Sequence, residues 1–153
     1  MKNLLIVTHT PSTNSQALTD AVIKGVRHPD ISGIILRVMP ALATTPEDVL
    51  WASGIILGTM ENFGYMSGGM KDFFDRIYYP CLEQTGALPY SLFIRAGNDG
   101  LGAKNSMERI ITGLGWKQVQ ETVICSGEFR PACLAACEEL GTTMAAGLEA
   151  GIY

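Results

Sequence analysis

A cluster of hydroxyl and amide side chains between residues 8 and 15 is the first part of the sequence that suggests chemistry. The apolar run Leu4–Val7 precedes it and a segment with helical periodicity follows it. A strand, a hydroxyl-rich turn and a helix N-terminus together favour phosphate binding, because the free N–H groups of the first helical turn and the helix dipole attract an anion. The alternative is that Ser12 or Asn14 only caps the helix. The cluster contains no acid, and its polar members are Thr8, Thr10, Ser12, Thr13, Asn14 and Ser15.

His9 lies inside this cluster and has two interpretations. Its imidazole is suited to donate to a phosphate oxygen or a substrate carbonyl near neutral pH. It is equally suited to be a loop residue whose hydrogen bonds are satisfied within the fold. No residue is identified as catalytic, and no metal site is expected, because Cys133 and Cys137 on one helix face are too weak a pattern.

Apolar segments alternate with segments of helical periodicity along the whole chain. Such alternation requires right-handed crossovers and a parallel sheet covered on both faces. We therefore expect one α/β domain over residues 1–153, with a three-layer, doubly wound, five-stranded parallel sheet. The expected strands cover residues 4–7, 34–38, 54–58, 91–94 and 118–124. The first expected helix follows residue 15 and stops at Pro29. Three more begin at residues 45, 67 and about 101; Pro80 ends the helix that begins at 67, and Gly115 ends the helix that begins near 101. The last helix extends from residue 131 to about 147.

Two further loops follow strands of this predicted sheet and have an unusual composition. Residues 59–66 contain methionines and aromatic side chains that we expect to be exposed, and residues 95–102 are rich in glycine. In doubly wound sheets, ligands bind beyond the carboxyl ends of the strands, where the winding reverses. We therefore expect these two loops and the hydroxyl cluster to meet at one site.

These three loops resemble those of flavodoxin-like proteins, in the branch of NAD(P)H-dependent FMN and quinone reductases. Residues 10–15 resemble the family's Ser/Thr-x-Ser/Thr-Gly-x-Ser/Thr loop. Residues 55–76 are the most specific match, with an apolar strand, Gly-Thr, Phe-Gly-Tyr-Met-Ser and a Lys-x-Phe-x-Asp-Arg helix. The resemblance covers nearly the whole chain and implies the strand order 2-1-3-4-5 with FMN at the switch point.

The resemblance also implies which residues hold the cofactor. The first loop would bind the FMN phosphate, the second would follow the edge of the ring, and the third would close over its other end. Glu61 has two interpretations, facing the ring or lying solvated in its loop. The implied cofactor-binding residues are Thr8, His9, Thr10, Ser12, Thr13, Asn14, Ser15, Thr59, Met60, Glu61, Asn62, Phe63, Gly64, Ala96, Gly97, Asn98 and Gly100.

Three positions depart from the pattern of the family. Thr13 replaces the glycine of the phosphate loop, whose missing Cβ lets the backbone approach the phosphate closely. Met60 stands where a proline is common, and Asn62 stands where an aromatic side chain often lies on the ring. These departures bear on how tightly FMN is held and leave the expected fold unchanged.

The expected function is transfer of electrons from NAD(P)H through FMN to a quinone, a flavin or a similar small acceptor. The alternatives are a flavodoxin-type FMN electron carrier and a flavodoxin-fold binding protein without flavin. Carriers that resemble flavodoxin usually cover both ring faces with aromatic side chains, whereas the loop 95–102 has none. One ring face would then be open for a nicotinamide or quinone, which must approach to about 3–3.5 Å.

Composition limits the partners. The net charge is −4 and no Lys/Arg cluster occurs, so a nucleic-acid partner lacks an electrostatic basis. No apolar stretch suggests secretion or membrane insertion, and we expect a cytoplasmic protein whose cysteines are reduced thiols. We also expect a homodimer or larger assembly with the flavin near its interface. The expectation of an assembly rests on the apolar and aromatic side chains that we expect to be exposed near the site, namely Met60, Phe63, Tyr65, Met66, Tyr78 and Tyr79.

Overall fold

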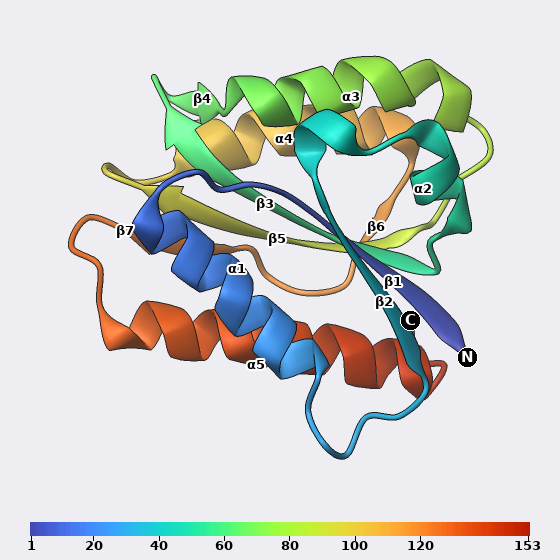
Figure 1. Cartoon of the computed structure of the whole chain (residues 1–153). Coiled ribbons are helices and arrows are strands. Elements are labelled where there is room, and N and C mark those ends of the chain that lie inside the picture. The colour runs from blue at the N-terminus through green and yellow to red at the C-terminus, as the bar shows by residue number, and fades with distance from the viewer.

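The computed structural model of the chain covers residues 1–153 and has a central sheet with helices on both faces (Figure 1). The strands are β1 (Lys2–His9), β2 (Ile34–Pro40), β3 (Gly54–Asn62), β4 (Tyr65–Met66), β5 (Pro89–Ala96), β6 (Lys117–Gln118) and β7 (Val123–Ser126). The helices are α1 (Thr13–Val26), α2 (Pro46–Trp51), α3 (Gly68–Cys81), α4 (Leu101–Leu114) and α5 (Pro131–Glu149), with a 3₁₀ turn η1 (Ala41–Ala43).

The strand order of the sheet is β2-β1-β3-β5-β6, and β7 also pairs with β5. All these pairings are parallel, and only the two-residue β4 is antiparallel, to β3. The order 2-1-3-4-5 predicted for five strands is confirmed, with the fifth position shared by β6 and β7.

The fifth strand differs from the continuous segment 118–124 that the sequence predicts. It is interrupted between Gln118 and Val123 because polar groups there bond outside the ladder. The Gln118 side-chain amide donates to the Gln120 carbonyl at 3.0 Å, and the Gln120 amide donates to the Leu140 carbonyl of α5 at 3.3 Å. The interruption gives the chain a second, short strand beside the end of β5.

The two faces of the sheet bury two separate cores. In β1, Leu5 and Val7 face the core under α2, α3 and α4, whereas Leu4 and Ile6 face the core under α1 and α5. Figure 1 shows the same division, with α3 and α4 above the sheet and α1 and α5 below it. Both faces of the central strands are covered, which explains why these strands read as continuous apolar runs.

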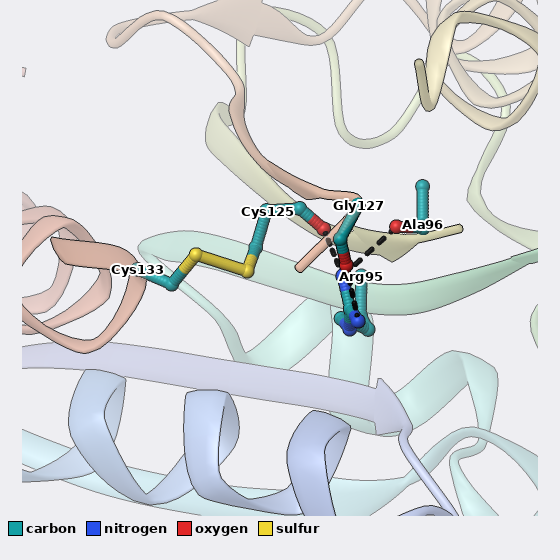
Figure 2. The surroundings of a disulfide bond; sticks show 5 residues. All are labelled: Arg95, Ala96, Cys125, Gly127 and Cys133. Atoms are coloured by element: carbon teal, nitrogen blue, oxygen red, sulfur yellow. Dashed lines mark hydrogen bonds between the residues drawn. A yellow bond between two sulfur atoms is a disulfide. The ribbon is translucent and has the colours of Figure 1, made fainter. Parts of the chain in front are cut away.

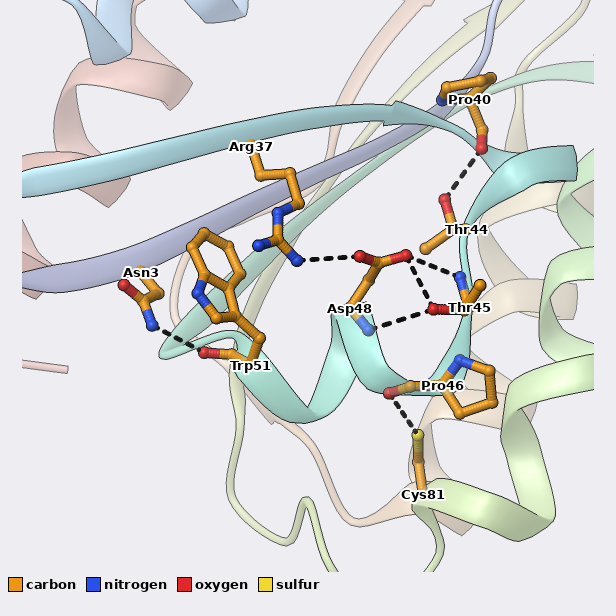
Figure 3. Close-up of polar contacts among 9 residues, drawn as sticks. All are labelled: Asn3, Arg37, Pro40, Thr44, Thr45, Pro46, Asp48, Trp51 and Cys81. Atoms are coloured by element: carbon orange, nitrogen blue, oxygen red, sulfur yellow. Dashed lines mark hydrogen bonds and ion pairs between the residues drawn. The ribbon is translucent and has the colours of Figure 1, made fainter.

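The short helix α2 is held by side chains at both of its ends (Figure 3). Thr45 accepts from the Asp48 N–H, and the Asp48 carboxylate accepts from the Thr45 N–H at 2.8 Å, which forms a capping box. Arg37 of β2 pairs with Asp48 at 2.8 Å and places its guanidinium over the Trp51 ring. These contacts fix a six-residue helix that would be unstable alone.

Two helix ends lie beyond the predicted stop signals. α3 ends at Cys81 instead of Pro80, since a proline in the last turn removes a hydrogen bond without ending the helix at once. α5 continues to Glu149, past the predicted end near Gly147.

The prediction of four reduced thiols is wrong for one pair. Cys125 of β7 and Cys133 of α5 form a disulfide, with their Cα atoms 5.5 Å apart, whereas Cys81 and Cys137 are free and buried. The spacing of eight residues in the sequence did not show that the strand end and the first turn of α5 approach each other.

None of the helices has the length and apolar character that crossing a membrane requires.

Candidate functional site

Three strands end side by side at one edge of the sheet, which we call the carboxyl edge. His9 of β1 pairs with Thr59 of β3, and Thr59 and Met60 pair with Ile94 and Arg95 of β5. The segments after these strands are the three loops that the sequence singles out. The structure therefore brings the hydroxyl cluster, the 59–66 segment and the 95–102 loop to one edge.

The N-terminus of α1 is capped by hydroxyl groups only. The Ser12 Oγ accepts from the Ser15 N–H at 3.1 Å, and the Ser15 Oγ accepts from the Ser12 N–H at 3.1 Å. Thr13 and Asn14 are exposed, their N–H groups have no acceptor within the chain, and the first turn contains no acid. This end of α1 therefore presents free donors and a positive dipole end to solvent.

A surface depression of about 550 Å³ lies beside this N-terminus. It is lined by Thr10, Pro11, Ser12, Thr13, Gln16, Ala17 and Asp20. Sequence reasoning missed Gln16 and Asp20, which lie one and two turns along the same helix and are joined by a 3.0 Å hydrogen bond. Helical spacing from Ser12 was the signal that could have located them.

Three of the predicted phosphate-binding side chains are committed to the fold. Ser15 is fully buried in the capping box, and Thr8 is 9% exposed within β1. The Thr10 hydroxyl is 3.0 Å from the Thr19 hydroxyl of α1. Ser12 caps the helix, and the backbone N–H groups of Thr13 and Asn14 are the donors left free for an anion.

His9 packs its ring against the first turn of α3. A Cβ at Gly69 would lie 2.5 Å from the His9 Cδ2, so the absence of a side chain at Gly69 makes room for the ring. The His9 Nδ1 atom is buried and has no hydrogen-bond partner. The interpretation of His9 as a fully satisfied loop residue is therefore wrong for this atom.

The second predicted loop is in fact a β-hairpin. β3 extends to Asn62, and β4 returns from Tyr65 paired with it. The two turn residues, Phe63 and Gly64, have φ values of 53° and 70°. Two positive φ values identify a type I′ turn, which favours Asn, Asp or Gly, so a phenylalanine there costs conformational energy. The Phe63 ring is fully exposed at the tip.

The hairpin packs on the N-terminus of α4. The Glu61 carboxylate accepts from the Ala103 N–H at 3.1 Å, so Glu61 caps a helix, a role that neither of its two interpretations included. The Met66 N–H donates to the Ser106 Oγ at 3.2 Å, and the Met66 side chain is buried against the core instead of exposed. Sequence reasoning missed both contacts because their partners lie about forty residues away.

Thr59 lies beneath this hairpin and is fully buried. Its hydroxyl accepts from the Ser67 N–H at 3.1 Å, and the Ser67 hydroxyl in turn accepts from the Met70 N–H to cap α3. Thr59 therefore positions the start of α3, and its side chain does not face solvent. Met60 is partly exposed and Asn62 is exposed.

The third loop places some of its predicted residues at the surface. Gly97 and Asn98 are exposed, whereas Ala96 is buried and its carbonyl oxygen accepts from Arg95 at 2.9 Å. Gly100 is buried and has φ 74° at the N-cap of α4. Asp99 caps the same helix, since its Oδ1 accepts from the Leu101 N–H at 3.0 Å.

Arg95 is a cation at the carboxyl edge that sequence reasoning did not assign. Besides Ala96, its guanidinium donates to the carbonyl oxygens of Cys125 at 3.0 Å and Gly127 at 2.7 Å. An arginine at the end of an otherwise apolar strand was the available signal. Its donors hold β5 and the β7–α5 loop together.

Two thiols have raised pKa values, and neither lies in the three loops. Burial raises the pKa of Cys137 to about 12. Burial, and secondarily the charge of Glu47, raises the pKa of Cys81 to about 11. Both thiols are therefore protonated at neutral pH and belong to the core. No group of three or more His, Cys, Asp and Glu side chains is arranged to hold a metal ion.

Comparison with known proteins identifies the fold. No protein-family model matches the chain. A curated flavodoxin from Aquifex aeolicus (strain VF5) is 34% identical over 114 residues, which are 74% of this chain and 60% of that protein. The chain thus spans about three fifths of the length of that relative.

Solved structures give the same fold over nearly the whole chain. A flavodoxin from the domain Archaea superposes with a TM-score of 0.78 at 16% identity, over 96% of this chain and 99% of that one. Oxidised flavodoxin 1 from Bacillus cereus gives a TM-score of 0.77 at 16% identity, over 94% and 97% of the two chains. The fold is flavodoxin-like.

Proposed function

We propose that this chain, whose fold is flavodoxin-like, is an FMN-binding redox protein. The observation that carries the proposal is the acid-free N-terminus of α1 at the carboxyl edge, with free N–H groups at Thr13 and Asn14. These donors suit the phosphate of FMN, since a helix N-terminus binds phosphate without any lysine or arginine. The similarity to a protein named flavodoxin supports the same cofactor.

Residues of the three loops would hold different parts of the cofactor. The backbone N–H groups of Thr13 and Asn14 would bind the phosphate, while the hairpin at Met60–Gly64 and the exposed Gly97 and Asn98 would border the ring. When bound, FMN supplies the redox chemistry. The chain's own task is to bind and orient it and to limit the access of water.

Electron carriage is the activity that the comparisons support best, because the curated relative and the solved structures are named flavodoxins. A carrier needs only a bound cofactor with one exposed edge and a partner-facing surface. The fully exposed Phe63, held in an unfavourable turn conformation, would lie on that surface.

A second candidate is an NAD(P)H-dependent FMN or quinone reductase. It is favoured by the loop 95–102, which has no aromatic side chain to cover a ring face. An uncovered face would admit a nicotinamide or quinone in stacking contact. The two activities differ in one measurement: a reductase oxidises NAD(P)H with a small quinone at steady state, and a carrier does not.

Titration of the purified chain with FMN and with riboflavin tests the cofactor. Isothermal calorimetry or quenching of flavin fluorescence should give a dissociation constant at least tenfold lower for FMN, because riboflavin lacks the phosphate. A chain that binds neither compound would contradict the proposal. Equal affinities would contradict the assignment of the phosphate to α1.

A homodimer or larger assembly is part of the proposal. Phe63 is fully exposed, Tyr79 is 80% exposed and Tyr65 is 42% exposed, and aromatic side chains are enriched at subunit interfaces. Light scattering at micromolar concentration should give at least twice the monomer mass of 16.5 kDa. A monomeric mass would exclude the assembly without affecting the cofactor assignment.

A further inference from the structure

The disulfide at the carboxyl edge joins a partly exposed cysteine to a buried one. Cys125 lies in β7 and is 1% exposed, whereas Cys133 is partly exposed in the first turn of α5 (Figure 2). Cys133 is the more exposed of the two residues, so exchange would begin at its sulfur.

The position of Cys133 favours its thiolate. It is the third residue of α5, a helix of 19 residues whose first turn has no acid and no side-chain cap. Pro131, at the first position of the helix, supplies no N–H, and Glu128, in the loop before the helix, pairs with Arg130 at 3.2 Å. A thiol at a helix N-terminus ionises more readily and is a better leaving group than an ordinary cysteine.

The backbone around Cys125 is held by contacts that do not depend on the disulfide. Arg95 donates to the carbonyl oxygens of Cys125 and Gly127, and the Gly127 N–H donates to the Ala96 carbonyl at 3.0 Å (Figure 2). When the bond opens, these contacts keep Cys125 and Gly127 in place on β5, and α5 still packs against β7. The two sulfurs then stay close enough for the bond to form again.

We propose that Cys125–Cys133 is a reversible redox site that exchanges two electrons with a dithiol. A thiolate of the dithiol attacks the Cys133 Sγ, the disulfide breaks, and Cys125 leaves as a thiolate that takes up a proton. The second thiol of the dithiol attacks the mixed disulfide and releases the Cys133 thiolate. The protein disulfide is reduced to two thiols, the dithiol is oxidised to a disulfide, and no further reactant is needed.

The site does not depend on the proposed cofactor, and the other cysteines do not compete for it. Cys137 lies one turn after Cys133 but is fully buried, and Cys81 is buried in the core on the other face of the sheet. These two thiols provide internal controls in the same chain.

Native exchange tests the proposal directly. The purified chain is equilibrated at pH 7 in mixtures of reduced and oxidised dithiothreitol, quenched with acid, alkylated and analysed by peptide mass spectrometry. Cys125 and Cys133 should gain label together in one reversible transition, while Cys81 and Cys137 stay unlabelled and circular dichroism stays constant. A bond that opens only after denaturation, or one that never forms in the oxidised mixtures, would overturn the proposal.

The role of the helix N-terminus is tested with Cys133 as a free thiol. In Cys125→Ser, the alkylation rate of Cys133 by iodoacetamide is measured at pH 7, alone and combined with Ala132→Glu. The added acid in the first turn should slow the reaction by about twofold to fivefold. Ala146→Glu, on an exposed position near the other end of α5, should leave the rate unchanged. Equal rates for all three proteins would overturn the role assigned to the N-terminus of α5 in activating Cys133.

Discussion

Two helices of equal length, α1 and α4, begin at the carboxyl edge, and their N-termini are satisfied by opposite chemistry. α1 is capped by the neutral hydroxyls of Ser12 and Ser15. α4 has no hydroxyl cap, and the carboxylates of Asp99 and Glu61 accept from its first N–H groups at 3.0 and 3.1 Å. The N-terminus of α1 therefore has donors left for an external anion, whereas the N–H groups at the start of α4 already bind two carboxylates of the chain.

Position at a sheet edge is therefore insufficient to define a phosphate site. Both N-termini carry the same partial positive charge, yet carboxylates already neutralise that of α4. A phosphate brought to α4 would meet two carboxylates at its first N–H groups, whereas at α1 it would meet free N–H groups and hydroxyls, with the carboxylate of Asp20 two turns along the helix. The capping residues therefore favour α1 over α4 as the position of the proposed cofactor phosphate.

The largest expected effect comes from giving α1 the chemistry of α4. Ser12→Asp keeps a good helix cap but places a carboxylate beside the proposed phosphate. FMN affinity, measured by calorimetry, should fall at least tenfold, because like charges about 4 Å apart repel by several kcal/mol near a protein surface.

Ser12→Asn is the matched control, since asparagine caps helices as well as aspartate and carries no charge. It should keep FMN affinity within about threefold, or about 0.6 kcal/mol. If the Asp and Asn variants bind FMN equally well, the phosphate does not lie at α1, and the difference in capping between α1 and α4 does not determine where it binds.

The fold could be predicted from the sequence where the determinants are local. Continuous apolar runs such as Leu4–Val7, and the Thr45 capping box, place strands and helices without reference to the rest of the chain. The break between β6 and β7 could not be predicted, because the Gln120 side chain bonds to a carbonyl of α5 twenty residues away. The Cys125–Cys133 bond was missed for a related reason, since it depends on where α5 begins in space.

In the candidate site, too, the roles that could be predicted are those whose hydrogen-bond partners lie nearby in the sequence. Ser12 could be identified as a helix cap because its partner, Ser15, lies three residues away. The role of Glu61 could not be seen, since the N–H that it caps belongs to Ala103. The Phe63–Gly64 turn does have a local signal, because Asn62 precedes it and Gly64 is its second residue. The resemblance of this segment to a flavin-binding loop led to the prediction of a loop instead of a hairpin.

A smaller effect is expected from removing an acid at α4. Glu61→Ala removes a charged acceptor from the Ala103 N–H, and the free energy of unfolding, measured by urea denaturation, should fall by about 1 kcal/mol. Glu139→Ala is the control, because Glu139 is exposed on α5 and makes no side-chain hydrogen bond or ion pair; its change should stay within about 0.5 kcal/mol. An equal loss in both variants would mean that Glu61 does not cap α4 in solution.

The smallest expected effect concerns Thr13, where the resembled family has glycine. Thr13→Gly removes the Cβ at the first position of α1 and lets the backbone N–H groups approach the phosphate more closely. FMN should bind on the order of threefold more tightly, which corresponds to about 0.6 kcal/mol. Asn14→Gly loosens the same turn without restoring the glycine of the pattern, and it should not improve binding. A gain in both variants would assign the effect to flexibility of the turn, and a loss in Thr13→Gly would mean that the Thr13 side chain itself binds the phosphate.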